Sequence, residues 1–362
     1  MTTAAIRALF KPEPESIYLD TATYGLLPSP TVAAMQRALL RWQAGSADFI
    51  AEWERAGDES RALFARLIGA GEDEIALVPT VSVGVGPMVA SLAPGDEVVV
   101  PDAEFTSVLF PLLVAAESRG VIVRQVPFAG VAGAITGRTR LAAFSLVQSQ
   151  GGRAADLAGI CQAARQHGAR VLVDATHAIP FYPVAGFLPA IDVLVCHGYK
   201  HLLCPRGAGF LYVRRDVQDA LPPVHANWRS VATFDAGSYG GPLALAPDAR
   251  RFDVSLDWLA WVGARQSLAL LLEWQAAGAL TAAHQLAREL ARQLGEPPPG
   301  ASVVSCPVAD AETVLTMLGR AGIRAGAPAG RIRLAPHVYN TAAEIDRVVS
   351  LLEPFVVGEN RA

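Results

Sequence analysis

Lysine is nearly absent from this chain. Only Lys11 and Lys200 are lysines among the 30 basic residues, so arginine carries almost all of the positive charge. Arginine stays protonated and cannot form a Schiff base, whereas a buried lysine can lose its proton and react with a carbonyl group. Lys11 lies in the N-terminal tail beside prolines. Lys200 is therefore the candidate reactive amine, and the alternative is a lysine that snorkels at a strand end.

A surplus of positive charge is also missing. The 34 acidic residues outnumber the 30 basic ones, which gives a net charge of −4, and a nucleic-acid-binding surface needs a basic surplus or a basic stripe. No apolar run approaches the roughly 18 residues of a membrane-spanning helix, and the N-terminus lacks the ordered regions of a signal peptide. We therefore expect a cytoplasmic protein that binds neither nucleic acid nor membrane.

Cysteine is scarce, and its spacing fits no metal site. The four cysteines lie in apolar strands, beside them or in a helical pattern, which is typical of reduced core residues: Cys161, Cys196, Cys204 and Cys306. His197 and His201 stand four residues apart, a spacing that binds zinc when it falls on a helix. Here it straddles a strand end and lacks the accompanying glutamate, so we predict no metal.

The residues that are abundant indicate a large core. Hydrophobic residues make up 52% of the 362 residues and charged residues only 18%, which predicts a globular chain of two domains. Val171–Val173 forms an apolar run that ends at Asp174, and Val193–Cys196 forms a second run shortly before Lys200. A third apolar run, Gly209–Val213, follows a turn. Ligands bind beyond the carboxyl ends of such strands, so Asp174 and Lys200 predict a buried cofactor site.

Two segments carry a specific resemblance. VDATHA and HGYKHLLCPRGAGFLYV resemble the cofactor core of the class V, fold-type I pyridoxal-phosphate enzymes, which include cysteine desulfurases, selenocysteine lyases, isopenicillin-N-epimerase-like proteins and aminotransferases. The resemblance extends over about residues 17–356. It implies an α/β fold, with a large domain (17–257) built on a mostly parallel seven-stranded sheet between helices. A small C-terminal α+β domain (258–362) with an N-terminal arm (1–16), and a homodimer, are also implied.

By this resemblance, pyridoxal 5'-phosphate is the cofactor and Lys200 forms the Schiff base with it. Asp174 pairs with the pyridine nitrogen, and His177 contacts the phenolic oxygen of the ring. The chemistry requires these residue types, because the coenzyme withdraws electrons only while its pyridine nitrogen stays protonated. A buried carboxylate favours that charge.

The resemblance implies further coenzyme contacts, each with a structural alternative. Thr80 and Ser82 open a helix whose free N–H groups suit a phosphate, or they form an ordinary N-cap. Phe105 falls where desulfurases carry a histidine stacked on the coenzyme, or it is a core residue. His197 takes a phosphate-contacting position, and Ser255 reaches the phosphate of a partner subunit. For His197, as for His201 and His337, a structural role is the preferred alternative to a catalytic one.

The substrate contacts are inferred in the same way. The segment RIRLAPHVYNTAAEID resembles a family hallmark that places Arg333 on the substrate α-carboxylate, with Arg331 as the fallback. Gln148 and Ser149 fall where family members touch the coenzyme or the substrate carboxylate, although a polar turn also explains them. Tyr24 belongs to an entrance segment that is either structural or in contact with the substrate.

A missing cysteine shapes the functional prediction. Desulfurases keep a nucleophilic cysteine shortly before the carboxylate arginine, where this chain reads GIRAGAPAGRIR. We therefore expect Cα–H labilisation by Lys200 and β-elimination from a cysteine-type amino acid, a C–S lyase reaction. Aminotransfer, with Arg229 or Arg251 as a second substrate arginine, and epimerisation are the alternatives. An inactive pyridoxal-phosphate-binding regulator is the non-enzyme alternative, which the set of Lys200, Asp174 and Arg333 disfavours.

Overall fold

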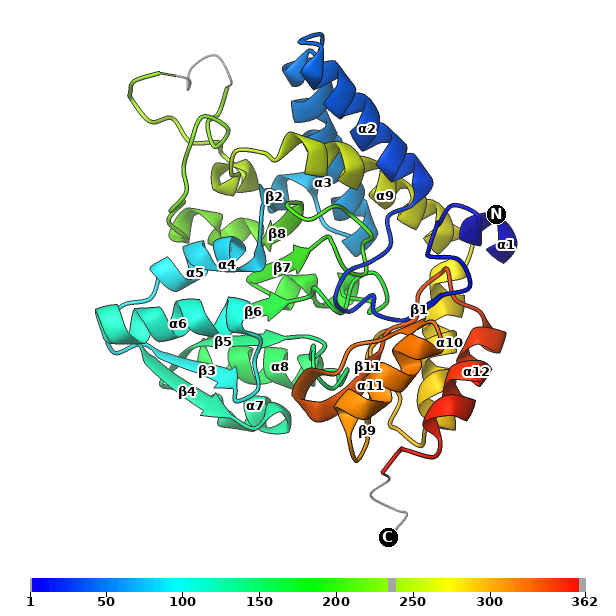
Figure 1. Cartoon of the computed structure of the whole chain (residues 1–362). Helices are drawn as coiled ribbons and strands as arrows, with labels where there is room; N and C mark the ends of the chain where they lie inside the picture. The colour runs from blue at the N-terminus through cyan, green and yellow to red at the C-terminus, as the bar shows by residue number, and fades with distance from the viewer. Residues whose placement is uncertain (1, 234–238, 358–362) are drawn as a thin grey trace.

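The computed structural model describes residues 2–233 and 239–357, so the last residues of the predicted small domain, 358–362, lie outside the described part. One seven-stranded sheet, in the order β2-β8-β7-β6-β5-β3-β4, forms the centre of the molecule (Figure 1). The strands of the chain are β1 (Ile17–Tyr18), β2 (Ile75–Val78), β3 (Glu97–Pro101), β4 (Ile122–Val126), β5 (Thr139–Ser145), β6 (Arg170–Asp174), β7 (Val193–His197), β8 (Gly209–Val213), β9 (Val304–Pro307), β10 (Ile323–Arg324) and β11 (Arg331–Leu334).

The large sheet is mostly parallel, as predicted. Strands β4, β3, β5, β6 and β7 pair in parallel with their neighbours, and β8 is antiparallel to both β7 and β2. The three predicted apolar runs are β6, β7 and β8. Parallel strands bring their carboxyl ends to one edge of a sheet, so the residues after β6 and β7 meet there.

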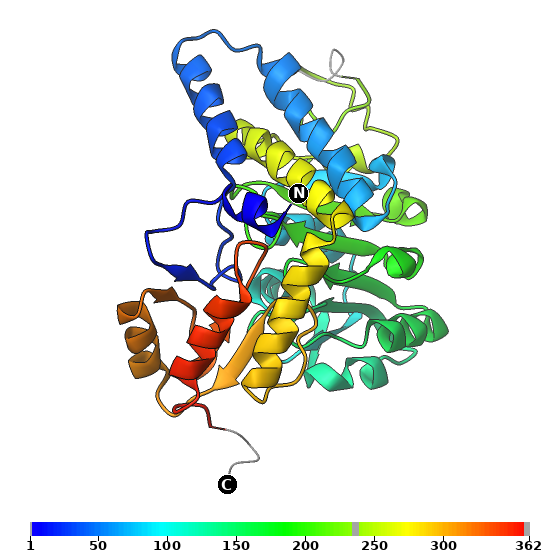
Figure 2. The ribbon, with the colours of Figure 1, turned by 90° about the vertical axis from the view of Figure 1, so that its right-hand side faces the viewer.

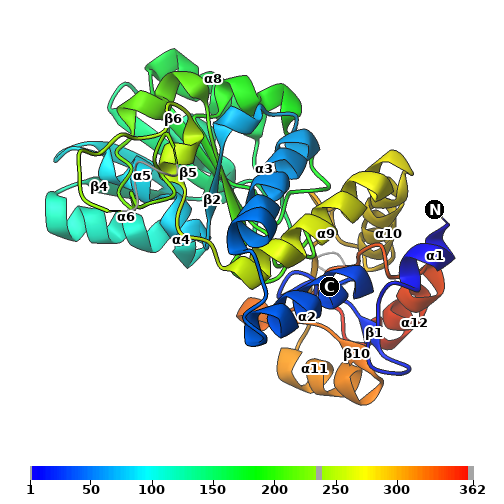
Figure 3. The ribbon, with the colours of Figure 1, turned by 90° about the horizontal axis from the view of Figure 1, so that it is seen from above.

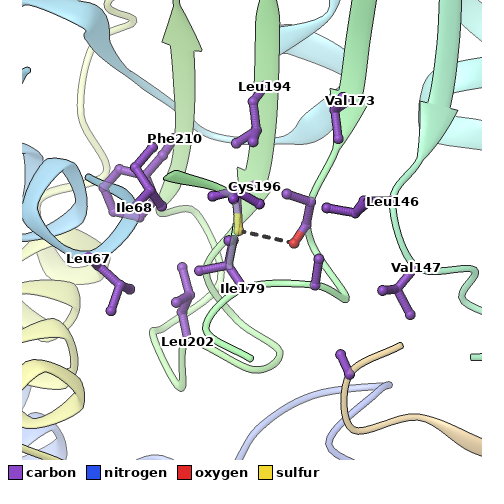
Figure 4. Close-up of a cluster of buried hydrophobic side chains, with 14 of the residues drawn as sticks. Leu67, Ile68, Leu146, Val147, Val173, Ile179, Leu194, Cys196, Leu202 and Phe210 are labelled. Carbon is purple, nitrogen blue, oxygen red and sulfur yellow. Dashed lines mark hydrogen bonds between the residues drawn. The ribbon is translucent and has the colours of Figure 1, made fainter. Parts of the chain in front are cut away.

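Both faces of this sheet are buried, because side chains along each strand point alternately to one face and the other and pack there. On β6, Val171 and Val173 belong to one apolar cluster and Leu172 to another, as the period of a strand requires. Helices α6 and α8 lie on opposite sides of the sheet (Figure 3). Figure 4 shows Phe210 beside Ile68 at the end of α3, with Leu194 and Cys196 next to them on β7. A sheet that is buried on both faces explains the unbroken apolar runs of the sequence.

The helices surround this sheet and form a second layer at one end. They are α1 (Thr3–Arg7), α2 (Ser29–Gln43), α3 (Arg55–Ile68), α4 (Val81–Gly84), α5 (Gly86–Ala90), α6 (Thr106–Arg119), α7 (Val131–Ala134), α8 (Leu157–His167), α9 (Trp258–Ala276), α10 (Ala279–Gln293), α11 (Ala311–Arg320) and α12 (Ala342–Leu352). Helices α2 and α3 both pack on α9. Among the described residues, no helix is long and apolar enough to cross a membrane.

The C-terminal elements carry two small sheets. Strands β9 and β11 pair antiparallel, and β10 pairs in parallel with β1 from the N-terminal segment. Helices α10 and α12 lie side by side, and α10 packs against β9 (Figure 2). A capping box between Thr341 and Glu344 opens α12. The division of the chain at residues 257/258 stays a prediction, because α9 packs on helices that precede it.

Candidate active site

Asp174 and Lys200 lie at the carboxyl edge of the large sheet. Asp174 is the last residue of β6, and Lys200 follows the end of β7 by three residues. Their exposed fractions are only 5% and 6%. The backbone N–H of Thr176 donates to Asp174 Oδ1 over 2.9 Å and holds the carboxylate at the strand end. The two strands therefore bring together the charged pair that the sequence predicted.

Burial makes the amine of Lys200 easy to deprotonate. Burial lowers the pKa of Lys200 to about 8, although the charge of Asp174 acts in the opposite direction. Burial also raises the pKa of Asp174, while the hydrogen bonds from Thr176 and the charge of Lys200 lower it. A neutral amine is the nucleophilic form of lysine, so Lys200 meets the requirement for Schiff-base chemistry near neutral pH.

Two buried histidines extend the hydrogen-bonded contacts of Lys200 into the protein. Lys200 Nζ lies 2.9 Å from His177 Nε2, and His177 Nδ1 lies 3.2 Å from His201 Nε2. Burial lowers the pKa of both histidines well below the ordinary value, and the charge of Lys200 adds to the effect. Both rings are therefore neutral at physiological pH. The pairing of His201 with His177 is a contact that the sequence prediction did not include.

The aromatic ring of Phe105 also faces the amine of Lys200. It is the N-cap residue of α6, and its ring centroid lies 5.2 Å from Lys200 Nζ. Its side chain is 43% exposed, so the alternative of a core phenylalanine is wrong. An aromatic face next to the reactive amine suits stacking on a planar coenzyme ring.

Glu104 is a neighbour that the sequence reasoning missed. It is buried, and it accepts hydrogen bonds from the backbone N–H of Ser145 over 2.7 Å, from the Ser145 hydroxyl, and from the backbone N–H of Phe105 over 2.8 Å. Burial raises the pKa of Glu104 to about 7, and the charge of Asp174 contributes. Its place next to Phe105, three residues after the end of β3, was the available signal.

The predicted phosphate contacts lie at the same edge. Register places Val78, Gly209 and His197 in one row across β2, β8 and β7, and Thr80 follows β2. Thr80 Oγ1 accepts from the backbone N–H of Val83 over 3.3 Å, which confirms an N-cap, and the neighbouring Ser82 is exposed.

His197 offers a test of whether this edge fits an anionic group. His197 Nε2 is buried and has no hydrogen-bond partner within the described ranges. Burial lowers the pKa of His197 to about 4, so the ring is neutral and can donate from one nitrogen. A buried polar atom without a partner points to a missing ligand group, and a phosphate fits it.

Arg333, the predicted carboxylate-binding arginine, contacts residues of the entrance segment and of the turn at Ser149. Its guanidinium donates to Thr23 Oγ1 over 2.7 Å and to the backbone oxygen of Ser149 over 3.0 Å, and it lies 3.5 Å from Asp20. Arg331 instead donates to Ser305 on the paired strand, to Oγ and to the backbone oxygen, each over 3.0 Å. Of the two arginines that the sequence offered, Arg333 is therefore the better candidate for a carboxylate.

The entrance segment is fixed against the Lys200 loop. Gly25 donates from its backbone N–H to Tyr199 O over 2.8 Å, and a Cβ at this position would lie 2.3 Å from the backbone oxygen of Lys200. Tyr24 is held through its backbone oxygen, which accepts from the Tyr18 hydroxyl over 2.6 Å, while its side chain is 53% exposed. The ring of Tyr24 packs against the ring of the buried Tyr18, with centroids 5.5 Å apart, and part of the Tyr24 side chain stays exposed for contact with a bound molecule.

Three of the remaining candidates have different surroundings. Gln148 is buried and accepts from Arg153 over 3.4 Å. Arg229 and Arg251, the candidates for a second substrate arginine, are both engaged elsewhere: Arg229 with Glu54, Asp58 and Asp253, and Arg251 with Asp219 and the backbone of Ala246.

Ser255 lies on the exposed stretch before α9. The four cysteines are free and buried. Among the described residues, no group of three or more histidine, cysteine, aspartate or glutamate side chains could hold a metal ion.

The fold and this edge define the class of the protein. A mostly parallel seven-stranded sheet between helices, with a buried lysine and aspartate at its carboxyl edge, is the architecture of the fold-type I pyridoxal-phosphate enzymes. The model of the aminotransferase class-V family matches residues 17–348, and the chain belongs to this family. Its coenzyme is therefore pyridoxal 5'-phosphate, and the residues of the site fit it.

Individual relatives agree with this assignment. A probable cysteine desulfurase of Methanothermobacter thermautotrophicus is 31% identical over 62% of this chain, and the match spans 60% of that relative's length. Isopenicillin N epimerase of Streptomyces clavuligerus is 26% identical over 94% of this chain and 95% of its own. The solved structure of the cystine C–S lyase C-DES with cysteine persulfide superposes with a TM-score of 0.83 at 22% identity, covering 94% of this chain and 98% of the other. These findings confirm the resemblance and the fold that the sequence predicted.

Proposed function

We propose that the chain is a C–S lyase that releases the sulfur-bearing group of a cysteine-type amino acid by β-elimination. The observation that supports this most strongly is a contrast between the amine and the thiols of the chain. The buried amine of Lys200 loses its proton easily, whereas the thiols of the four cysteines do not. Burial raises the pKa of Cys161 to about 11 and that of Cys306 to about 12, and raises the pKa of Cys196 and Cys204 as well. A persulfide-forming desulfurase needs an accessible thiolate.

The residues of the site have separate roles in this proposal. When bound, pyridoxal phosphate supplies an electron-withdrawing ring that acidifies the Cα–H bond of an amino acid. Asp174 holds positive charge at the pyridine nitrogen, and Lys200 removes the Cα proton with its neutral amine. Arg333 binds the α-carboxylate through two of its three guanidinium nitrogens and so orients the Cα–H bond. Phe105 covers one face of the site and excludes water from it.

The remaining predicted residues complete the coenzyme site in this proposal. His177 holds the phenolic oxygen, and the phosphate lies among Thr80, Ser82 and the free nitrogen of His197. Gln148, Ser149 and Tyr24 surround the substrate. A protein that only binds the coenzyme has no use for Arg333, so a regulator is the weaker alternative.

Epimerisation and aminotransfer are the competing reactions. The epimerase from Streptomyces clavuligerus matches this chain over almost its whole length, which favours epimerisation as the second candidate. Aminotransfer between dicarboxylates is less well supported, because Arg229 and Arg251 already have acidic partners. Both alternatives begin with the same proton removal by Lys200.

The decisive experiment compares products. Purified enzyme with cystine and cysteine S-conjugates is expected to release pyruvate and ammonia in equal amounts, and Lys200→Ala is expected to release neither. Cystine is a sensible first substrate because the chain shares the fold of a cystine C–S lyase. Formation of a keto acid only when a second keto acid is present, or racemisation without pyruvate, would contradict the elimination.

We also propose a homodimer and a cytoplasmic location. The exposed Ser255 supports the dimer, since the resemblance lets this hydroxyl reach the phosphate of a partner subunit. The four free thiols suit a reducing compartment. Gel filtration with light scattering tests the first proposal, and a tagged chain imaged in its own cell tests the second.

A further inference from the structure

A buried chain of three side chains runs from the reactive amine into the protein. Lys200, His177 and His201 are 6%, 4% and 0% exposed, and their nitrogens are separated by 2.9 and 3.2 Å. Each imidazole is neutral and carries one proton, so each is a donor at one nitrogen and an acceptor at the other. The donor-to-acceptor direction of both hydrogen bonds is therefore set by His201, according to which of its two ring nitrogens carries the proton.

The Nδ1 atom of His201 decides which of its two nitrogens carries the proton. His201 Nδ1 is buried and lacks a hydrogen-bond partner in the described part of the chain. A proton at Nδ1 would leave an unpaired N–H group in the core, whereas a bare Nδ1 leaves only an unpaired acceptor, and orphaned buried donors are the rarer of the two. The favoured tautomer of His201 therefore carries its proton on Nε2.

The position of His201 itself is fixed by His337. His337 Nδ1 accepts from the backbone N–H of Val338 over 2.9 Å, so His337 carries its proton on Nε2 and donates to the backbone oxygen of His201 over 3.0 Å. The rings of His201 and His337 stack with centroids 6.3 Å apart, and Phe181 meets His201 edge-on at 5.9 Å. The ring of His201 is thus held in place by its neighbours.

We propose that His201 is a positioning residue that makes His177 a hydrogen-bond donor toward Lys200. His201 Nε2–H donates to His177 Nδ1, so His177 carries its own proton on Nε2 and offers it to the lone pair of the neutral Lys200 amine. An ammonium could not accept this hydrogen bond, so the arrangement selects the unprotonated amine. The lowered pKa of Lys200 agrees with this direction.

Other charged groups also act on Lys200 and stay unchanged in the test. The other titratable groups that act on it from the surrounding elements include Asp174, Cys196, Asp20, Arg333 and His197. Asp174 and Asp20 raise the pKa of Lys200, and Arg333 lowers it. A replacement of His201 alters none of them, so a change in the pKa of Lys200 would come from the histidine pair.

The scarcity of lysine makes the measurement direct. Full-length chain without coenzyme, labelled with [ε-¹³C]lysine, gives two lysine side-chain signals, Lys200 and Lys11, and Lys11 serves as the internal reference. We expect His201→Leu to raise the pKa of Lys200 by about one pH unit, because His177 can then turn its acceptor toward an ammonium and one hydrogen bond of ordinary strength changes a pKa by about that amount.

His201→Gln is the matched control. Its side-chain N–H can donate to His177 Nδ1 in place of the imidazole, so the pKa of Lys200 is expected to stay within about 0.3 units of the wild type, a small fraction of the shift expected for loss of the bond. An equal rise in both variants would mean that His201 acts by packing alone and would overturn the proposal. An unchanged or lowered pKa in His201→Leu would also overturn it.

A second measurement needs no variant. In the full-length chain labelled with [¹⁵N]histidine, the nitrogen shifts are expected to show His177 and His201 both protonated on Nε2, and protonation of His177 on Nδ1 would refute the proposal. The functional meaning of the inference rests on Lys200 as the coenzyme-binding amine. Adding pyridoxal phosphate tests that separately, since the Lys200 signal then shifts if the coenzyme attaches and stays if it does not.

Discussion

Arg333 is already hydrogen-bonded before any substrate binds. Its guanidinium contacts Thr23 Oγ1 and Ser149, and its Nε is buried without a partner among the residues described. We expect Arg333→Lys to lower kcat/KM about 100-fold, mainly through KM, because lysine keeps the charge but loses the planar pair of donors. Arg331→Lys is the control, with a change of less than about threefold, because the guanidinium of Arg331 bonds Ser305 and lies outside the proposed substrate site. Similar losses in both variants would contradict the assignment of Arg333.

Glu104 predicts how the stability of the protein depends on pH. Its pKa in the folded state is about 7, compared with 4.5 for an unperturbed glutamate. The stability that comes from its bound proton is therefore fully present below pH 4.5 and is lost as the pH rises through 7. Over this window wild type should lose about 3 kcal/mol relative to Glu104→Gln, whose side chain does not titrate. Urea unfolding of both proteins at pH 5 and pH 8 measures this, and parallel curves would refute it.

Arg229 belongs to a buried ionic cluster that joins distant elements. It pairs with Glu54 and Asp253, and Asp253 also pairs with Arg61 of α3 over 2.6 Å and accepts from the backbone N–H of Leu77 in β2. Arg229→Leu would leave the buried carboxylate of Glu54 without its ion-pair partner, while Asp253 keeps Arg61. We expect a loss of about 3–5 kcal/mol in the free energy of unfolding.

The matched control for this cluster is Arg251→Leu. Arg251 pairs with Asp219, whose side chain is 91% exposed, so a loss of less than about 1 kcal/mol is expected. Unfolding by guanidinium measures both variants. If Arg229→Leu were as stable as wild type but lost activity with dicarboxylates, Arg229 would be a substrate residue and not a structural one.

Elements with strong local patterns could be predicted from the sequence. The apolar runs at β6, β7 and β8 were visible because strands buried on both faces read as continuous hydrophobic stretches. Between residues 49 and 67 the apolar residues recur at helical spacing, and this stretch consists of a π-helical segment, Phe49–Glu54, followed by α3. Helical spacing of apolar residues does not distinguish these two forms, because the difference lies in backbone hydrogen bonds and not in the pattern of side chains.

At the scale of the whole molecule, the sequence predicted the centre of the site better than its surroundings. Asp174 and Lys200 could be found because the first ends a buried strand and the second shortly follows one. The contact of Arg333 with Thr23 spans 310 residues, and that of His177 with His201 spans 24. Such contacts follow from tertiary packing, which no local pattern encodes. Glu104 was missed for the same reason, since its partner Ser145 lies 41 residues away at the end of β5.

The proposed homodimer predicts which surface meets the second copy. Five apolar side chains at the end of α2 and in the following π-helical segment are exposed, and we name them the α2 apolar surface: Leu39, Leu40, Trp42, Phe49 and Ile50. Trp42 and Phe49 both contact Trp258, with ring centroids 5.6 and 5.3 Å apart. Trp258 stands three residues after Ser255, so this surface adjoins the hydroxyl that is proposed to reach the partner.

A charge in the α2 apolar surface should therefore weaken the dimer and the coenzyme site together. We expect Leu39→Glu, at a side chain that is 54% exposed, to raise the dimer dissociation constant about 10- to 100-fold, because a buried apolar contact is replaced by a desolvated charge. Sedimentation velocity measures this, and a parallel fall in coenzyme affinity would show that Ser255 acts across the interface. Val114→Glu on α6, 62% exposed, is the control and should change neither. An intact dimer in Leu39→Glu would place the interface on another face, and a monomer that keeps full coenzyme affinity would remove Ser255 from the site.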